Sequence, residues 1–259
     1  MPDEKWKTAI TDVKPNKIVM RGYPVDELLG KISFAQAVYL ILKGEWPTPD
    51  VGKLIDAVLV ASIDHGASPP STLAARTVAS TGGELNAAIA AGVLAINKFH
   101  GGAIEEGQRL FLEIAERAGE LGGNEEKAAK DVLDEMKAGG KRASGYGHRL
   151  HTKDPRTGKL FALAENLHLA EKHVRIARLV ERILGERMGK ILPINVDGAI
   201  AALLCDLGIP PEIGNAFFII SRVPGIVAHV HEEKTRMKPM RKIDPENFEY
   251  DGPPERKAP

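Results

Sequence analysis

The sequence of 259 residues contains a single cysteine, Cys205, so no disulfide can form within the chain. A protein without disulfides does not need an oxidising compartment, and the cytoplasm is therefore the expected location. Cys205 ends the apolar run that begins at Ile200. That setting is typical of a small core residue rather than of a nucleophile.

Net charge of either sign is also absent, because 35 basic residues balance 35 acidic ones. This balance gives no reason to expect nucleic acid or an anionic membrane as a partner, although a site for a small anionic substrate can still be locally basic. No charge-free apolar run reaches the length of a membrane-spanning helix, and no secretory h-region follows the first residues. We therefore expect a soluble protein that acts on a small molecule.

Motifs for metals and nucleotides are missing as well. His229 and His231 are two residues apart, which puts them on different helix faces, and their segment is not His-Glu-x-x-His. The glycine-rich segment 138–147 holds neither a P-loop nor a Gly-x-Gly-x-x-Gly pattern. We predict no metal site and no tightly bound cofactor.

Helical signals dominate the rest of the chain, and strand alternation is rare outside a possible hairpin in residues 7–20. No strand–helix–strand rhythm or internal repeat is present, so the sequence predicts an all-α fold, a packed array of helices. The pattern predicts helices over 34–43, 49–63, 71–81, 84–99, 103–119, 124–137, 160–170 and 172–188, and again after Pro193 and Pro210.

Three histidines lie beside glycines: His65 in Asp64-His65-Gly66, His100 before Gly101-Gly102, and His148 after Gly145-Tyr146-Gly147. Glycine permits unusual backbone angles and lets a ligand approach the main chain closely. For each segment taken alone, a helix-ending glycine with a chance histidine nearby is the favoured explanation.

His148 is followed eight residues later by Arg156, which comes directly after Asp154-Pro155. Arginine offers a planar fork of donors for a carboxylate, and histidine can protonate a carbonyl oxygen near neutral pH. The pair suits a keto acid or a hydroxy acid, and a basic surface loop is the alternative. Lys141 and Arg142, just upstream, could meet phosphates by charge.

Two further residues stand in apolar surroundings. Asp197, in Asn195-Val196-Asp197-Gly198, opens an apolar run and is either a helix cap or a general acid–base group. The pattern alone favours the cap. Arg222 lies inside the apolar stretch 216–230, where we expect it to meet a buried carboxylate of the protein or of a ligand.

Taken together and in order, these segments resemble the citrate synthase superfamily. The resemblance rests on Arg21-Gly22-Tyr23-Pro24, the stretch 33–48, Asp64-His65-Gly66 with 71–81, His100-Gly101-Gly102-Ala103, Gly145–Arg149 with Asp154-Pro155-Arg156, Asn195-Val196-Asp197, and Ser221-Arg222 with Gly225 and His229. It covers most of the chain.

The resemblance implies the roles of these residues. Asp197 exchanges the proton on the methyl carbon of an acetyl thioester, His100 stabilises the enol, and His148 serves the oxaloacetate carbonyl or the citryl hydroxyl. His65, Arg156 and Arg222 hold carboxylates. Lys141, Arg142, Gly145 and Gly147 lie against coenzyme A, which enters as part of the substrate.

Two departures from the family pattern bear on the reaction. Gly198 follows the aspartate where synthases usually carry an aromatic residue, and this form resembles citryl-CoA lyase and the C-terminal module of ATP-citrate lyase. A further substrate arginine near the C-terminus has no clean counterpart, although Lys238 or Arg241 could serve. The resemblance therefore implies cleavage of citryl-CoA to acetyl-CoA and oxaloacetate.

Three alternatives stay open. One is a short citrate or 2-methylcitrate synthase, since cleavage and condensation share a transition state. Another is a different acid, such as a citramalyl thioester. The last is a regulatory or scaffolding relative without turnover. The family also implies a dimer-based homo-oligomer, a large helical domain of residues 1–103 and 203–259, and a small mobile coenzyme A domain of residues 104–202.

Overall fold

The computed structural model describes residues 6–147, 154–242 and 249–257. The chain begins with the expected hairpin, in which β1 (Thr11–Lys14) pairs antiparallel with β2 (Lys17–Met20). Asn16 makes the turn with a φ of 58°, a left-handed conformation that asparagine tolerates better than most residues. β3 (Tyr23–Pro24) adds to β2 and leads into the short α1 (Val25–Leu28).

The next two helices begin and end where their sequence signals predict. Ser33 forms a capping box with Gln36 at the start of α2 (Phe34–Lys43), and Gly44 ends it in the left-handed conformation. Thr48 caps α3 (Pro49–Ser62), whose first residue is a proline. α3 therefore ends at Ser62, just before the segment that carries His65.

Two helices then form an arm with the C-terminal part of the long α11 (Gly214–Arg236). They are α4 (Pro70–Ser80) and α5 (Leu85–Leu94). The predicted helix over 84–99 is too long, because after Leu94 the chain turns tightly and Asn97 exchanges backbone hydrogen bonds with His100. A small apolar cluster of alanines, Ile226 and Val230 joins the three helices.

The second arm contains α6 (Ala103–Glu120), α7 (Glu125–Ala138), α8 (Pro155–Asn166), α9 (Lys172–Met188) and α10 (Val196–Asp206). The predicted helix over 160–170 begins five residues later than α8 does. Asp154 caps the earlier start, which places Arg156 in the first turn. η1 (Pro211–Ile213) then connects α10 to α11.

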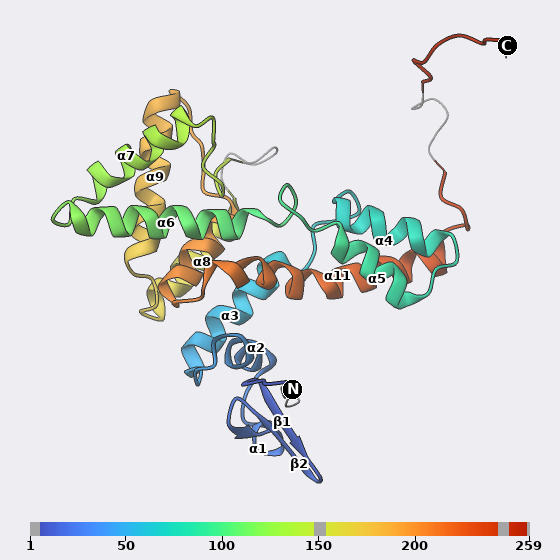
Figure 1. Ribbon diagram of the computed structural model, residues 1–259, viewed down its shortest axis with the longest axis horizontal. Helices are drawn as coiled ribbons and strands as arrows, with labels where there is room; N and C mark the ends of the chain where they lie inside the picture. Colours follow the sequence, from blue (N-terminus) through green and yellow to red (C-terminus); the bar gives the residue numbers. More distant parts are fainter. Residues whose placement is uncertain (1–5, 148–153, 243–248, 258–259) are drawn as a thin grey trace, which may run out of the picture.

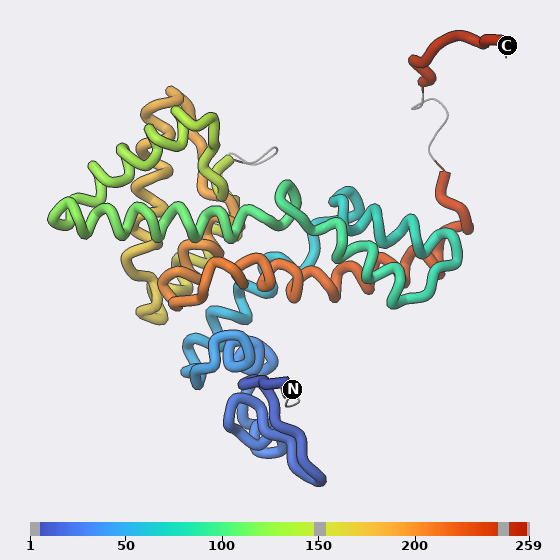
Figure 2. The backbone as a smooth tube through the Cα atoms, in the orientation of Figure 1, coloured from blue at the N-terminus to red at the C-terminus, as the bar shows by residue number. Residues whose placement is uncertain are grey.

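α10 is the centre of the second arm, where it packs against α6, α8 and α9 and is buried over almost its whole length. α11 runs along both arms, as the tube in Figure 2 makes plain, while α3 leads down to α2 and the hairpin (Figure 1). The prediction of an all-α fold is confirmed, because the described strands form only the small sheet β1–β2–β3.

Residues Pro211–Arg236 form a helical segment that is long and apolar enough to cross a membrane by length and composition. Arg222 lies in the middle of this segment, so the segment is not the charge-free apolar run that the sequence was expected to lack. This helix nevertheless packs against α3, α4, α5 and α6, and it buries Arg222 and Glu233. Such packing is that of a core helix.

Candidate active site

His65 lies in the loop that follows α3, and this loop packs against α11. The Asp64 carboxylate accepts a hydrogen bond from the Gly66 amide at 3.0 Å and lies 3.0 Å from Nε2 of His229 on α11. A Cβ atom on Gly225 would come within 2.4 Å of the Ile63 carbonyl oxygen, so only glycine allows α11 this close. Desolvation, followed by the charges of Arg156 and Arg222, lowers the pKa of His65.

His100 stands at the end of the tight turn between α5 and α6. Its Nε2 lies 2.8 Å from Oγ of the buried Ser71, at the start of α4, and its ring meets that of Phe218 edge-on at 5.6 Å. Gly101 has a φ of 82°, and a Cβ atom there would clash with Phe218 at 2.7 Å. Burial, then the charge of Arg222, lowers the pKa of His100, which favours a neutral imidazole.

Arg222 is buried on α11, as its apolar neighbours predict. Its Nε donates to the Ser62 carbonyl oxygen at 2.9 Å, and its guanidinium covers the ring of Phe218 at 4.6 Å. Nη1 is buried without a hydrogen-bond partner, and burial lowers the pKa of the guanidinium. None of its recorded hydrogen bonds within the described chain goes to a carboxylate, so a ligand carboxylate is the better reading of the two predicted.

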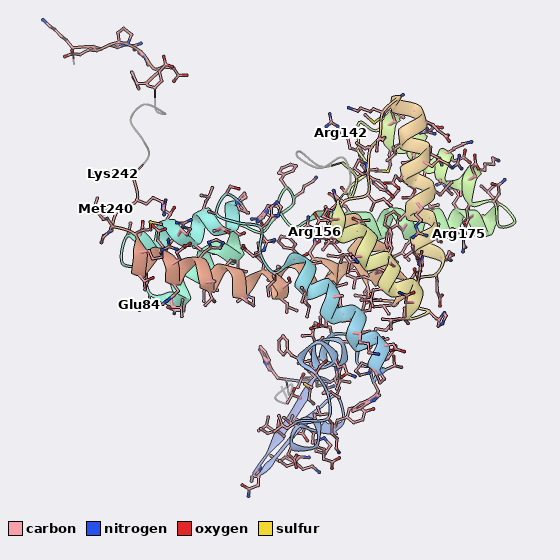
Figure 3. All side chains as sticks on the ribbon, turned by 180° about the vertical axis from the view of Figure 1, so that it is seen from behind. Glu84, Arg142, Arg156, Arg175, Met240 and Lys242 are labelled. Carbon is pink, nitrogen blue, oxygen red and sulfur yellow. The ribbon has the colours of Figure 1, made fainter. Side chains whose placement is uncertain are left out.

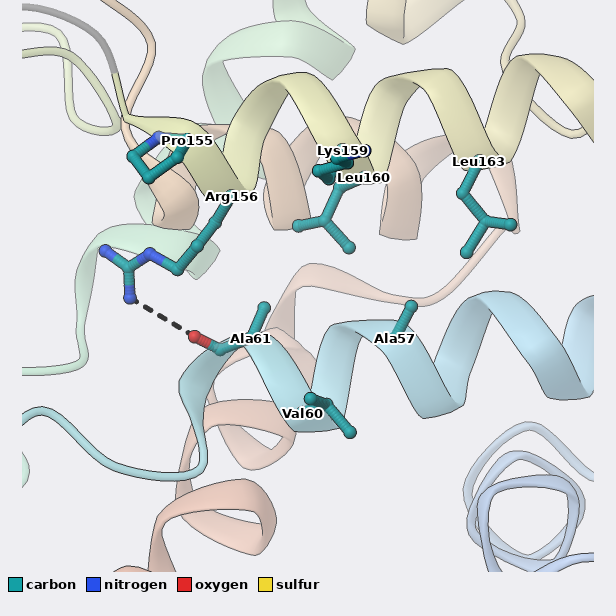
Figure 4. A pocket seen from close by; sticks show the side chains of 8 residues that line it. All are labelled: Ala57, Val60, Ala61, Pro155, Arg156, Lys159, Leu160 and Leu163. Carbon is teal, nitrogen blue, oxygen red and sulfur yellow. Dashed lines mark hydrogen bonds between the residues drawn. The ribbon is translucent and has the colours of Figure 1, made fainter.

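Arg156 reaches from the first turn of α8 toward the end of α3, where Nη1 donates to the Ala61 carbonyl oxygen at 3.2 Å (Figure 4). Its other edge forms a fork with Asp154, through Nε to Oδ1 at 3.0 Å and Nη2 to Oδ2 at 2.9 Å. The stem of Arg156 also borders a groove of about 520 Å³ between α3 and α8. The other lining residues are mostly apolar, and no other predicted site residue lines the groove, so we place the chemistry beside the guanidinium instead.

Asp197 lies in the first turn of α10, but it is not the cap of that helix. Asn195 is the cap, with its side-chain oxygen accepting from the Gly198 amide at 3.1 Å. The favoured interpretation of Asp197 as a cap is therefore wrong, and its half-buried carboxyl is available for another task. Burial raises its pKa, against the opposing charges of Arg156 and Arg222.

The turn of residues 145–147 packs directly on the start of α10. The Gly145 carbonyl oxygen accepts from the Asn195 amide at 3.0 Å, the Gly147 amide donates to Pro193 at 2.7 Å, and the Asn195 side chain donates to Gly147 at 3.0 Å. Gly145 and Gly147 have φ values of 88° and 82°, which explains both glycines. His148 itself lies outside the described residues.

The structure brings five predicted residues into one electrostatic neighbourhood: His65, His100, Arg156, Asp197 and Arg222. The charges of Arg156 and Arg222 both act on Asp197 and on His65, and Arg222 and His65 both act on His100. The charges of two arginines thus act on one carboxyl with a raised pKa, that of Asp197, and on imidazoles with lowered pKa values, those of His65 and His100. This combination suits acid–base chemistry on a polycarboxylate.

Other predicted residues lie elsewhere. Lys141 and Arg142 are exposed in the loop after α7, and Figure 3 shows Arg142 farther out on its arm than Arg156. Arg241 binds Glu233 at the far end of α11, where Arg76 also donates to Glu233 at 2.7 Å. Glu233 follows Arg222 by eleven helical residues, or about 16 Å. Among the described residues, the hydrogen bonds of the Arg241 side chain go to Glu233 and not to this site.

Cys205 and possible metal ligands were not expected to contribute to the site. Cys205 is buried, and burial raises the pKa of its thiol to about 12, so it is a core residue. Within the described ranges, no group of three histidine, cysteine, aspartate or glutamate residues is placed to hold a metal ion.

Sequence reasoning missed Ser71 and Asp154 as partners of the site. Ser71 carried no visible signal, since its contact with His100 joins residues 29 apart. Asp154-Pro155 is a helix-start signal that could have placed the start of α8 correctly. The spacing of residues in the sequence does not predict that the side chains of Ser71 and Asp154 contact the site.

Comparison with known proteins agrees with the resemblance to the citrate synthase superfamily that the sequence motifs indicate. The family model described as "Citrate synthase, C-terminal domain" matches residues 47–243. The citrate synthase of Haloferax volcanii is 32% identical over 198 residues, which are 74% of this chain and 49% of that protein. The chain thus spans about half the length of the curated relatives it matches.

Solved structures add two matches over nearly the whole chain. The citryl-CoA lyase from Hydrogenobacter thermophilus is 44% identical with a TM-score of 0.89, and the match covers 98% of this chain and 97% of that one. The ATP citrate lyase of Methanosaeta concilii, in complex with (3S)-citryl-CoA, has a TM-score of 0.82 at 22% identity, with 98% and 43% covered. The second match supports the fold alone. With its helical array, its ordered motifs and a family match over most of its length, the chain belongs to the citrate synthase family.

Proposed function

We propose that this protein is a citryl-CoA lyase, which cleaves citryl-CoA to acetyl-CoA and oxaloacetate. The observation that carries the choice of reaction is the end-to-end match, at 44% identity, to a citryl-CoA lyase of nearly the same length. The curated synthases are matched in sequence over only about half their length. Two solved synthase structures are covered to 96%, but with lower TM-scores of 0.59 and 0.63. Gly198, in place of an aromatic residue after the aspartate, supports the same choice.

The carboxylates of the substrate are bound by Arg222, Arg156 and His65. Arg222 has a buried Nη1 without a protein partner, and Arg156 keeps N–H groups beyond those bound by Asp154 and Ala61. Arginine forks match carboxylates in geometry as well as charge, so this set orients the acid before bond cleavage.

Cleavage begins at the citryl hydroxyl, whose proton is taken by His148. The carbon–carbon bond breaks as the hydroxyl carbon becomes the keto carbon of oxaloacetate. The bonding electron pair passes to the thioester unit as an enolate. His100, kept neutral by burial and by Arg222, donates a hydrogen bond to the thioester oxygen where this charge develops.

Asp197 then delivers a proton to the enolate carbon and so completes the methyl group of acetyl-CoA. A carboxyl can be such an acid only if part of it is protonated near neutral pH, and burial raises the pKa of Asp197 in that direction. In the reverse direction the same carboxylate removes the proton.

Coenzyme A enters as part of the substrate and lies against the turn that holds Gly145 and Gly147. Lys141 and Arg142 are exposed cations upstream of this turn and are suited to its phosphates. The division into a large domain and a small mobile domain of residues 104–202 is part of this proposal, because it lets the turn close over the substrate.

A homo-oligomer is also part of the proposal. Large apolar side chains are exposed on the arm of α4 and α5, among them Leu73 at 49%, Leu85 at 47% and Leu94 at 77%. A second copy packed on this arm would cover them. Such packing would also let Arg241 reach the site of the other copy.

An assay with purified protein tests the reaction. Citryl-CoA should yield oxaloacetate and acetyl-CoA. The oxaloacetate is detected by adding malate dehydrogenase and following the oxidation of NADH. The second candidate is a short citrate or 2-methylcitrate synthase, favoured by the matches to citrate synthases. Formation of free citrate and thiol from acetyl-CoA and oxaloacetate would reject the lyase in favour of the synthase.

A further inference from the structure

Asp154 is a buried carboxylate whose hydrogen-bonding capacity is used in full. Oδ1 accepts from the backbone amide and from Nε of Arg156, both at 3.0 Å. Oδ2 accepts from Nη2 of Arg156 at 2.9 Å and from the Val196 amide at 3.2 Å. The side chain is 1% exposed. One carboxylate thus binds an arginine and the first turns of two helices, α8 and α10.

The contacts of Arg156 show what this arrangement does to its guanidinium. A guanidinium has five N–H donors in a fixed plane. Asp154 takes the edge formed by Nε and Nη2, and the Ala61 carbonyl oxygen takes one donor of Nη1. The remaining donors lie on the Nη1 and Nη2 side. Asp154 therefore determines which edge of Arg156 is left for a ligand.

Asp154 also fixes the backbone next to Asp197, through its contact with the Val196 amide. Val196 is the first residue of α10, and Asp197 is the next. The other cap of this helix, Asn195, binds the Gly198 amide. Asp154 and Asn195 together hold the amides on both sides of Asp197, so they fix where its carboxyl stands relative to Arg156.

We propose that Asp154 is a positioning residue that ties the carboxylate-binding edge of Arg156 to the acid–base group Asp197. This inference rests on the proposed function and deepens it, because Arg156 holds the acid and Asp197 moves the proton. A single buried carboxylate, bound to Arg156 and to the amide that precedes Asp197, sets the spacing between the substrate carboxylate and the carbon that receives the proton.

The variant Asp154→Asn tests this with little change in volume. An amide nitrogen cannot accept, so one side of the fork or the Val196 contact is lost. We expect a fall in kcat for citryl-CoA cleavage on the order of 10²-fold, the loss typical of about 1 Å misplacement, together with a raised KM for oxaloacetate in the condensation direction.

A pH profile separates positioning from general damage. Burial is the main cause that raises the pKa of Asp197, and the charge of Asp154 adds to it. Asp154→Asn removes that addition. Exchange of the acetyl-CoA methyl hydrogens with solvent, which requires ionised Asp197, should therefore keep an acidic limb that moves to lower pH.

The matched control is Asp206→Asn. Asp206 is an equally buried carboxylate that accepts from the Glu171, His173 and Val174 amides at the start of α9. It stands at the other end of α10, about 14 Å along the helix from Asp197. We expect the kcat of Asp206→Asn to stay within about twofold of the wild-type value, because distant sites act independently. The acidic limb of its pH profile should stay in place.

The proposal is overturned if Asp154→Asn matches Asp206→Asn in kcat and leaves the pH profile in place. A readout without turnover separates this from a failure of the proposed function. In hydrogen–deuterium exchange of the ligand-free protein, Asp154→Asn should speed exchange at the first turns of both α8 and α10. Faster exchange in α8 alone rejects the tie between the helices, even if the wild type proves not to cleave citryl-CoA.

Discussion

The backbone of Gly145 lies directly on the backbone of Gly198, so a Cβ atom on Gly198 would come within 2.3 Å of the Gly145 carbonyl oxygen. A side chain at position 198, directly after Asp197, is thus incompatible with this position of the turn 145–147. The glycine that distinguishes the sequence from most synthases has a structural reason. It lets the proposed coenzyme A turn rest on the helix that carries Asp197.

The variant Gly198→Ala should displace this turn. We expect a loss of about 1–3 kcal/mol in the free energy of unfolding, as for other overpacked sites, and a raised KM for citryl-CoA. Gly119→Ala is the control, because a Cβ atom on Gly119 in α6 would meet nothing within 4 Å. It should gain about 0.5–1 kcal/mol. Equal stability of the two variants in urea unfolding would contradict the close contact.

Asp197→Asn should reduce cleavage by about 10²–10⁴-fold, the usual contribution of a general acid–base group. It should also raise the melting temperature at pH 7. Since burial raises the folded-state pKa of Asp197, its ionised form destabilises the fold above that pKa and not below the unfolded pKa. The gain over wild type should therefore disappear as the pH falls below about 4. A lower melting temperature at pH 7 would show that the carboxylate is stabilising instead.

Arg222→Lys should raise the KM for oxaloacetate by about 10–100-fold, because lysine cannot replace a charge-assisted fork. Oxaloacetate or citrate should raise the melting temperature of the wild type but not of this variant. The exposed Arg175, paired with Glu125 at 2.6 Å, provides the control substitution Arg175→Lys. Ligand-induced stabilisation that survives in Arg222→Lys would remove Arg222 from the proposed site.

Asp206→Asn should lower the free energy of unfolding at pH 7 by about 1.5–3 kcal/mol, the value of hydrogen bonds to a charged group. Hydrogen bonds from His173 and from neighbouring amides outweigh desolvation and lower the folded-state pKa of Asp206. Its stabilisation is present above the unfolded pKa and is lost as the pH falls through the folded pKa. Chemical unfolding of both proteins from pH 7 to pH 3 checks this, and a constant difference across that range would be the contrary result.

The sequence predicts most of this fold because its helix signals are local. The helices over 34–43 and 49–63 were placed almost to the residue, because their caps Ser33, Gly44 and Thr48 depend on only a few neighbouring residues. The helix expected through Phe99 ends at Leu94 because a tight turn around His100 outweighs the apolar pattern.

The site was predicted less fully, for a physical reason. His100, Asp197 and Arg222 could be selected from their surroundings and their order in the chain. The contact of His100 with Ser71, and that of Asp154 with Val196, join residues 29 and 42 positions apart. Packing of α4, α8 and α10 decides such contacts, and no local pattern encodes them.

Pro224 interrupts the backbone hydrogen bonding of α11. Proline has no amide hydrogen, so Pro224 leaves the hydrogen-bond ladder of this 23-residue helix one bond short, two residues beyond Arg222. α11 packs on α6 on one side of this point and on α4 and α5 on the other. The break in the hydrogen-bond ladder of α11, the longest helix of the described residues, thus lies two residues from an arginine of the proposed site and between its contacts with the two arms.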